Sequence, residues 1–359
     1  MSTKEQKIAN FDPSQPGLAD ASIYGLPFTA DESEIIVVPV PWEVTVSYGE
    51  GASLGPETIM EASFQVDLLH QEFPDLWKLG IYMDEAPAHW VSNSERYKEL
   101  AQPIIEALEA GKDIQQSPEL QADLAIINEA CESLNNALHQ HVSNWFAKGK
   151  KVILLGGDHS TPLGYYRALA DKYDNFGILH FDAHMDLRIA YEGFTYSHAS
   201  IMYNAIQLPQ VSKLIQVGIR DFCEQEVSVV KSSDKIHVFT DADLKAKQFE
   251  GKTWRQQVDE MIGLLPYNVA VSFDIDALYR WYCPNTGTPV PGGLSYEQAT
   301  YMLNTLANSD KNIIGIDLVE VAPGETDEWD GNVGARLLFH LCGVLAKNNG
   351  LDTGTPIMF

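Results

Sequence analysis

The chain has 359 residues, of which 45% are hydrophobic, and a formal net charge of −26 at pH 7. This acidic balance argues against nucleic acid or an anionic membrane surface as a partner, and we expect neither a signal peptide nor a membrane-spanning helix. The four cysteines have no CxxC spacing, so they indicate neither a zinc site nor a redox pair, and they fit a reducing, cytoplasmic location.

The elements predicted in chain order begin after a polar segment. Residues 1–33 contain Pro and Gly among polar residues, and we expect an N-terminal arm that wraps the surface. Apolar runs predict strands over residues 35–40, 78–83, 151–156, 177–182, 213–219, 236–240, 268–274 and 312–319. Helical patterns lie between many of them, over residues 55–63, 94–109, 119–147, 162–172, 253–264, 296–308 and 332–347.

This alternation predicts an α/β fold with three layers, α/β/α, around a central, mainly parallel sheet of about eight strands. The chemically distinctive residues are spread over 159–320, which favours a single catalytic domain over residues 34–359. Residues 91–148 form a helical insertion to which we assign no chemistry. We expect an outer helical pair there, available for oligomer contacts.

Three motifs place carboxylates and imidazoles directly after predicted strands. They read GGDHS over 156–160, FDAHMD over 181–186 and SFDID over 272–276. Alternate residues of an extended segment point to one side, and parallel sheets place their sites at the carboxyl ends of strands. The candidate metal ligands are His159, Asp182, His184, Asp186, Asp274 and Asp276.

Six such side chains exceed what one metal ion with an open coordination position needs. Imidazole and carboxylate ligands without a thiolate suit cations such as Mn²⁺, and bridging carboxylates fit two ions about 3.5–4 Å apart. A lone Asp or His at a strand end is more often a cap or a turn residue, and Asp158 could be one. We interpret His180 as a buried support rather than a seventh ligand.

The combined motifs resemble the ureohydrolase superfamily, which includes arginases, agmatinases, guanidinobutyrases, formiminoglutamases and guanidine hydrolases. The pattern continues with PNTGTP over 284–289 and the glycines at 292–293, and the resemblance covers nearly the whole chain from about residue 39. It implies the arginase-like fold and two divalent ions per chain, with Mn²⁺ usual and Ni²⁺ the alternative. One ion would take His159, Asp182, Asp186 and Asp274, and the other His184, Asp182, Asp274 and Asp276.

The resemblance also implies the chemistry. A hydroxide bridging the two ions would cleave a guanidino C–N bond, as in other hydrolases of linear amidines, and release urea plus an amine or ammonia. Asp186 would hydrogen-bond the hydroxide and pass on its proton, His198 would relay protons with solvent, and Glu320 would hold the guanidinium. The substrate would be a small cationic guanidino compound, and the protein would form a homo-oligomer, a trimer or a hexamer.

Departures from the family pattern bear on the substrate. Cys223 replaces an aspartate that arginases use toward the substrate's α-amino group, so arginine ranks low. Tyr279, Arg280 and Trp281 stand near a position where many members have Asp-Pro, which could remodel the adjacent wall. The loops at 41–51 and 283–293 are most similar to the agmatinase-type and guanidine hydrolase branch, and residues 191–198 are a plausible pocket wall. We expect substrate contacts from Tyr48, His198, Trp281, Thr288 and Glu320.

A small guanidine or alkylguanidine is therefore the first choice of substrate, with agmatine, guanidinobutyrate and formiminoglutamate as alternatives. Two hypotheses from other classes remain. One is a non-catalytic, metal-binding subunit of a hetero-oligomer, against which the complete set of ligands argues. The other is a zinc-dependent, deacetylase-like hydrolase, which would need one metal and leave the second ligand set without a purpose.

Overall fold

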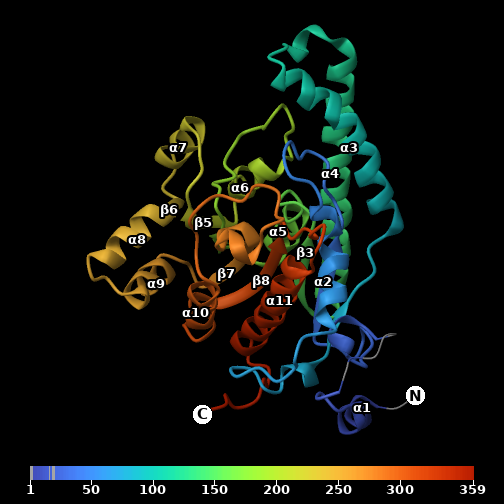
Figure 1. Cartoon of the computed structure of the whole chain (residues 1–359), viewed down its shortest axis with the longest axis vertical. Helices are drawn as coiled ribbons and strands as arrows, with labels where there is room; N and C mark the ends of the chain where they lie inside the picture. Colours follow the sequence, from blue (N-terminus) through green and yellow to red (C-terminus); the bar gives the residue numbers. More distant parts are fainter. Residues whose placement is uncertain (1–2, 16, 18–20) are drawn as a thin grey trace.

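The computed structural model describes residues 3–15, 17 and 21–359, and its centre is one eight-stranded sheet (Figure 1). The strand order is β2-β1-β3-β8-β7-β4-β5-β6, and all neighbouring strands run parallel. The strands are β1 (Ile35–Val40), β2 (Ile81–Met83), β3 (Lys151–Gly156), β4 (Phe176–Phe181), β5 (Val211–Ile219), β6 (Ile236–Thr240), β7 (Asn268–Asp274) and β8 (Asn312–Val319). The predicted parallel sheet is confirmed, and β2 is shorter than the predicted strand.

The sheet is the middle layer because both of its faces are apolar. Every residue of β1 and β4 is buried, as expected for parallel strands covered by helices on both sides. The stacked rings of Phe181 and Phe273 join β4 to β7 on one face, with centroids 4.9 Å apart. The aliphatic runs of the sequence therefore determine the layer in which the strands lie.

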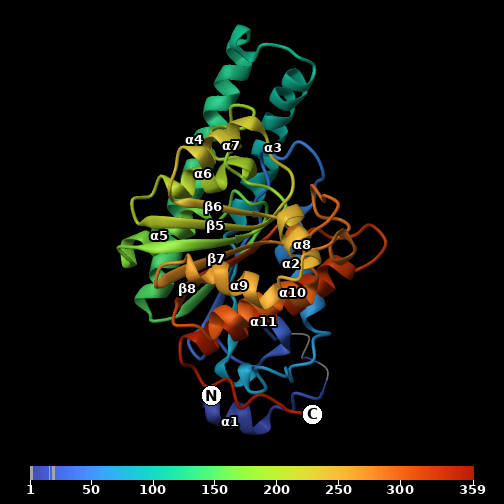
Figure 2. The same ribbon diagram turned by 90° about the vertical axis from the view of Figure 1, so that its left-hand side faces the viewer.

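Helices cover both faces of the sheet (Figure 2), and the buried apolar side chains form two separate clusters. One cluster includes α2 (Gly55–Ser63), α8 (Asp241–Phe249), α9 (Trp254–Gly263), α10 (Tyr296–Ala307) and α11 (Trp329–Asn348). The other includes α3 (Ala88–Glu109), α4 (Pro118–Ala147), α5 (Leu163–Lys172), α6 (Ile201–Ile206) and α7 (Glu224–Lys231). The arrangement confirms the predicted α/β/α layers.

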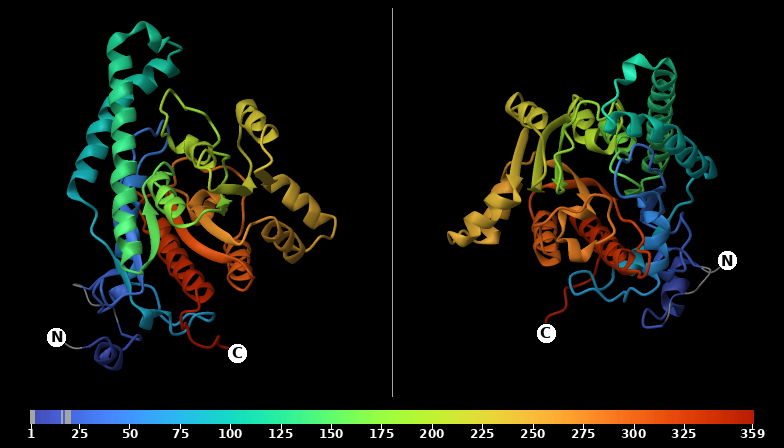
Figure 3. Two further views of the ribbon diagram at one scale, coloured as in Figure 1. Left: turned by 180° about the vertical axis from the view of Figure 1, so that it is seen from behind. Right: turned by 45° about the horizontal axis from the view of Figure 1, so that its top comes forward.

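The helical insertion predicted over 91–148 is a hairpin of α3 and α4 joined through the short 3₁₀ helix η4 (Ile114–Gln116). It extends well beyond the sheet (Figures 1 and 3). Helix α4 begins at a capped N-terminus, where Ser117 accepts a hydrogen bond from the backbone N–H of Leu120 and Pro118 opens the first turn. Its buried residues, including Leu134 and Leu138, pack toward α5.

Several short elements were not predicted. They are α1 (Lys4–Asn10), α6, α7 and α8, each of nine residues or fewer, a length at which an apolar period is weak. The segment expected to wrap the surface also differs in part, because residues 23–28 enter the core. There the Tyr24 hydroxyl donates to the carbonyl of Ala335 at 2.9 Å. Residues 1–2, 16 and 18–20 of that segment lie outside the described residues. Within the described chain, no helix is both long and apolar enough to cross a membrane.

Candidate metal centre

The four central strands of the sheet deliver the predicted site residues to one edge. In the order β3-β8-β7-β4, each strand ends near the same point, and the chain immediately after it carries a polar side chain. His159 follows β3, Asp182 follows β4, Asp274 ends β7 and Glu320 follows β8. This is the carboxyl edge at which parallel sheets place their ligands.

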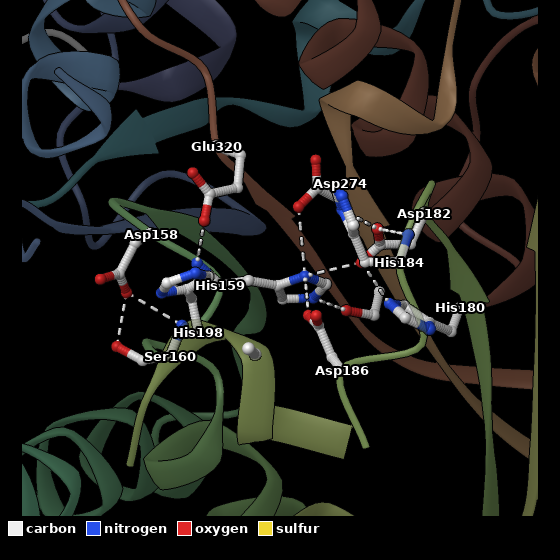
Figure 4. A network of polar contacts seen from close by, with 12 residues as sticks. Asp158, His159, Ser160, His180, Asp182, His184, Asp186, His198, Asp274 and Glu320 are labelled. Carbon is white, nitrogen blue, oxygen red and sulfur yellow. Dashed lines mark hydrogen bonds and ion pairs between the residues drawn. The ribbon is translucent and has the colours of Figure 1, made fainter. Parts of the chain in front are cut away.

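The first half of the cluster surrounds the imidazole of His159 (Figure 4). Its Nδ1 lies 3.1 Å from an oxygen of Asp182, 3.1 Å from Asp186 and 3.2 Å from Asp274. All four side chains are buried. Within the described chain this Nδ1 has no hydrogen-bond partner, and the Nδ1 atom and three carboxylate oxygens face a common point.

The second half surrounds the imidazole of His184. Its Nδ1 lies 3.1 Å from Asp276 Oδ2 and 3.4 Å from Asp182 Oδ1. Asp182 thus turns Oδ2 toward His159 and Oδ1 toward His184, which is the arrangement of a carboxylate shared by two ions. These three residues also bring their ligand atoms close enough together to hold a metal ion.

A layer of hydrogen bonds behind the cluster fixes the imidazoles. His159 Nε2 is 2.9 Å from the hydroxyl of Ser272, which donates to Asp317 at 2.7 Å, and the Tyr166 hydroxyl donates to the same carboxylate. Because Ser272 gives its proton to Asp317, its oxygen is left to accept from Nε2–H, and Nδ1 is the ring nitrogen that faces the three carboxylates. Such outer partners orient the ligands of metal sites.

His180 belongs to the same hydrogen-bonded layer. Its Nε2 is 2.8 Å from Asp182, and its Nδ1 is 3.0 Å from the amide nitrogen of Gln216, which also donates to the carbonyl of Met185. Both ring nitrogens are therefore engaged by protein groups. His180 also lies in a group with His159, Asp182 and Asp186 that is close enough together to hold a metal ion, so its role as a support stays a prediction.

The buried charges of the cluster shift each other's protonation. Burial and the nearby Asp182 raise the pKa of Asp186 to about 7, and burial with Asp276 and Asp182 raises the pKa of Asp274. Burial opposes charge on His184, but Asp276 and Asp182 raise its pKa to about 12. The carboxylates thus require protons or cations at close range. Together with the unpartnered Nδ1 of His159 and the purely nitrogen and oxygen donors, this requirement fits divalent metal ions.

A cavity of about 180 Å³ opens over this cluster. Its walls come from the strand ends and from the loops after β1, β4, β5, β7 and β8. The lining residues are Ser47, Tyr48, His159, His184, Asp186, Arg188, Tyr191, His198, Ala199, Asp221, Phe222, Glu226, Asp274, Thr288 and Glu320.

Glu320 occupies this cavity in a strained backbone conformation, with a φ of 64°. Its N–H donates to the carbonyl of Gly157, its carbonyl accepts from the Thr286 hydroxyl, and its carboxylate accepts from the backbone N–H of His159 at 2.7 Å. Burial, and then the charges of Asp274 and Asp158, raise the pKa of Glu320. These hydrogen bonds therefore hold the Glu320 carboxylate in a buried position beside other carboxylates, where a bound cation would stabilise its charged form.

His198 lines the same cavity with a neutral imidazole. Burial, followed by the positive charges of His184 and His159, lowers its pKa to about 4. Its ring lies edge-on to Tyr191, with centroids 6.3 Å apart. At neutral pH the imidazole is therefore uncharged, with one ring nitrogen that can accept a hydrogen bond and one N–H that can donate one.

Most predicted site residues meet at this cavity, and a few lie elsewhere. Asp182 and Asp276 lie behind its lining, Tyr48 and Thr288 contribute to the lining, and Asp158 forms a turn with Ser160, as the alternative interpretation allowed. Trp281 does not contribute to the lining. Its side chain is 64% exposed, and it stacks on Tyr279, with ring centroids 4.3 Å apart.

Five lining residues were not predicted from the sequence, and one of them, Ala199, directly follows the predicted wall segment 191–198. Arg188 lies two positions beyond Asp186, and Asp221, Phe222 and Glu226 follow the end of β5. The rule that loops at the carboxyl edge form the site could have identified the second group. Cys223, singled out as a departure from arginases, is the N-terminal cap position of α7 rather than a lining residue.

The comparisons with known proteins agree with this geometry. The Arginase family signature matches residues 33–343. N(1)-aminopropylagmatine ureohydrolase of Thermus thermophilus is 28% identical over 324 residues, covering 90% of this chain and 93% of the relative. Agmatinase of Neisseria meningitidis is 29% identical over 291 residues, covering 80% and 79%.

A solved structure supports the fold. The crystal structure of a hypothetical agmatinase from Burkholderia thailandensis superposes with a TM-score of 0.67 at 24% identity, covering 93% of this chain and 92% of that one. The family match over residues 33–343 rejects the deacetylase-like hypothesis. The residues for a binuclear metal site are present, and the chain belongs to the arginase family of metal-dependent ureohydrolases.

Proposed function

We propose that the protein hydrolyses a small guanidino compound, with guanidine or an alkylguanidine as the first candidate, and releases urea with an amine or ammonia. The observation that carries the proposal is that the carboxylate of Glu320 and the metal-ligand cluster line one small cavity. At about 180 Å³, the cavity is smaller than the roughly 300–1,000 Å³ typical of sites for drug-sized ligands. A compact cationic head fits it best.

The proposed ligands divide between two ions. The first would be held by His159, Asp182, Asp186 and Asp274, and the second by His184, Asp182, Asp274 and Asp276. The two oxygens of Asp182, which face different histidines, support a bridging role. Mn²⁺ is the first candidate metal and Ni²⁺ the second, because imidazole and carboxylate donors suit both.

Bound there, two divalent ions would lower the pKa of a water molecule and so supply a strong nucleophile near neutral pH. Glu320 would accept hydrogen bonds from the guanidinium and hold its carbon at the cluster. Asp186 would accept a proton from the attacking water and transfer it to the departing nitrogen. His198, which is neutral at physiological pH, would relay protons between the site and solvent.

The test is release of urea and ammonia from a panel of substrates after separate loading with Mn²⁺ and Ni²⁺. The panel contains guanidine, methylguanidine, agmatine, N(1)-aminopropylagmatine, guanidinobutyrate, arginine and formiminoglutamate. Guanidine or methylguanidine should give the highest kcat/KM. Turnover of none of them by a protein that holds two ions would contradict the proposal.

A second candidate is a substrate with a charged tail, because the cavity rim carries two opposite charges. Arg188 lines the cavity over the ring of Tyr191, at 4.7 Å, and would favour a carboxylate, as in guanidinobutyrate or formiminoglutamate. Asp221 lines it as well and would favour an amine, as the names of the Thermus and Neisseria relatives suggest.

The variants Arg188→Gln and Asp221→Asn distinguish a substrate with a carboxylate tail from one with an amine tail. Arg188→Gln should raise KM only for substrates with a carboxylate, and Asp221→Asn only for those with a second cation. Guanidine has no tail, so its KM should be nearly unchanged in both variants. Equal losses for all substrates would show that these charges have no role in selecting the tail.

A further inference from the structure

Two segments of the cavity rim are hydrogen-bonded to the α3–α4 hairpin. Residues 41–51 follow β1 and bring Ser47 and Tyr48 to the cavity. Residues 191–198 lie between the metal motif and α6, and bring Tyr191 and His198. Both loops lie beside the hairpin in the views of Figures 1 and 3.

Asn128 of α4 holds the second segment by two backbone groups. Its side-chain oxygen accepts from the N–H of Thr195 at 2.8 Å, and its side-chain nitrogen donates to the carbonyl of Gly193 at 3.2 Å. Asn204 of α6 donates to the carbonyl of Thr195 at 2.8 Å. Amide side chains therefore bind three backbone groups of residues 193–195.

Close packing accompanies these hydrogen bonds. Gly193 has a φ of +85°, and a Cβ at this position would lie 2.9 Å from a methyl carbon of Leu124 on α4. The loop can approach the helix this closely because the position is a glycine. The bound residues, 193–195, lie between Tyr191 and His198, which line the cavity. A shift of the anchor would therefore move both of them.

Helix α3 holds the first segment in a comparable way. The hydroxyl of Ser94 accepts from the N–H of Glu43 at 2.9 Å, and Lys98 lies 3.5 Å from Glu43 and 3.1 Å from Glu50. The buried carboxylate of Glu43 in turn accepts from the N–H of Gly51 at 2.9 Å. Both ends of the segment that carries Tyr48 are therefore tied to α3.

We propose that the α3–α4 hairpin is a positioning element that sets the places of the two rim segments above the metal cluster. Asn128 is the positioning residue for the segment that carries His198, and Ser94 is the one for the segment that carries Tyr48. The hairpin, to which the sequence assigned no chemistry, would thus act on the reaction through groups that it does not itself contribute. Only the consequence for turnover rests on the proposed function.

Hydrogen–deuterium exchange of the metal-loaded protein tests the placement without any substrate. Asn128→Ala should speed amide exchange over residues 191–200 and leave 41–51 unchanged, whereas Ser94→Ala should do the reverse. Asn144→Ala is the matched control, because Asn144 is an exposed residue of the same helix whose side chain accepts only from Gln140. Bound metal and the melting temperature should match those of the control.

Turnover of the best substrate then tests the consequence. Asn128→Ala should lower kcat by about 10- to 100-fold with KM nearly unchanged, since small misplacements of a catalytic group have effects of that size. Asn128→Asp keeps the acceptor for the N–H of Thr195, so its kcat should lie between those of the parent and of Asn128→Ala. If Asn128→Ala fails to fold, Asn128→Asp takes its place in the comparison.

Unchanged exchange over 191–200 in Asn128→Ala and Asn128→Asp would overturn the proposal. Faster exchange with unchanged kcat would overturn the role in the reaction. A parent protein that turns over no guanidino compound would count against the proposed function alone, because the exchange experiment still decides whether the hairpin positions the rim.

Discussion

The floor and the rim of the cavity are built in different ways. The floor carries the ligands on or just after β3, β7 and β4, and five of the six ligand side chains are buried, with Asp182 at 0% exposure. The rim consists of loops held by a few side-chain hydrogen bonds and by close backbone contacts, and Tyr48 is 83% exposed. A ladder of backbone bonds fixes the floor, so the candidate metal ligands sit on the rigid part. The groups that select the substrate sit on the adjustable part.

The largest effect is expected from the floor residue that both ions would share. Asp182→Ala should abolish activity and lower the metal content, because neither half of the cluster keeps its full set of ligands. The rim variant Asp221→Ala should keep the parent's metal content. Metal analysis and turnover check both, and a fully loaded, active Asp182→Ala protein would contradict the bridging assignment.

Glu320 lies where floor and rim meet. Glu320→Gln should retain both ions but lower turnover by about 100- to 1,000-fold. A neutral amide cannot hold the positively charged guanidinium of the substrate as a carboxylate does. Glu325→Gln, at an exposed position nearby in the sequence, should behave like the parent. Normal turnover by the Glu320 variant would remove its role in binding the guanidinium.

Ser272 tests the layer behind the floor. Ser272→Ala leaves His159 Nε2 without its partner and should weaken metal binding by about 10- to 100-fold. Competition with a chelator measures the change, and Ser228→Ala, an exposed serine on α7, is the control. Equal affinity in the two variants would show that the hydrogen bond does not tune the site.

The smallest effect concerns stability and pH in the chelated protein. The pKa of Asp186 is raised to about 7 and that of His184 to about 12, so the folded state binds protons more tightly than the unfolded one at both residues. The stability contributed by these protons is present at low pH and is lost as pH rises, first through Asp186 and then gradually above about 6.5 through His184.

Bound ions replace these protons, so the melting temperature gained on metal loading should increase between about pH 5.5 and 8.5. Buried His340, whose pKa is lowered to about 3 by burial and by His70, acts in the opposite direction. The effect of His340 on the melting temperature is the same with and without metal, so it cancels when the two melting temperatures are subtracted. A gain that shrinks as pH rises would contradict the prediction.

The sequence by itself determined the sheet, its helical layers and the family. Apolar runs, such as the fully buried β1 and β4, identify parallel strands locally, and alternate acids and histidines after a strand share one side because of the strand's two-residue period. The metal-ligand cluster could be predicted for the same reason, since parallel strands end at a common edge.

Only the tertiary structure decided what surrounds that cluster. The pairs Asn128 with Thr195 and Ser94 with Glu43 join residues far apart in the chain, and no local period connects them. Arg188 and Asp221 reach the cavity, while Trp281 stacks on Tyr279 away from its lining, because loop paths depend on which distant side chains satisfy their backbone groups. The buried residues 23–28 and the φ of 64° at Glu320 likewise depend on contacts that form only when the layers assemble.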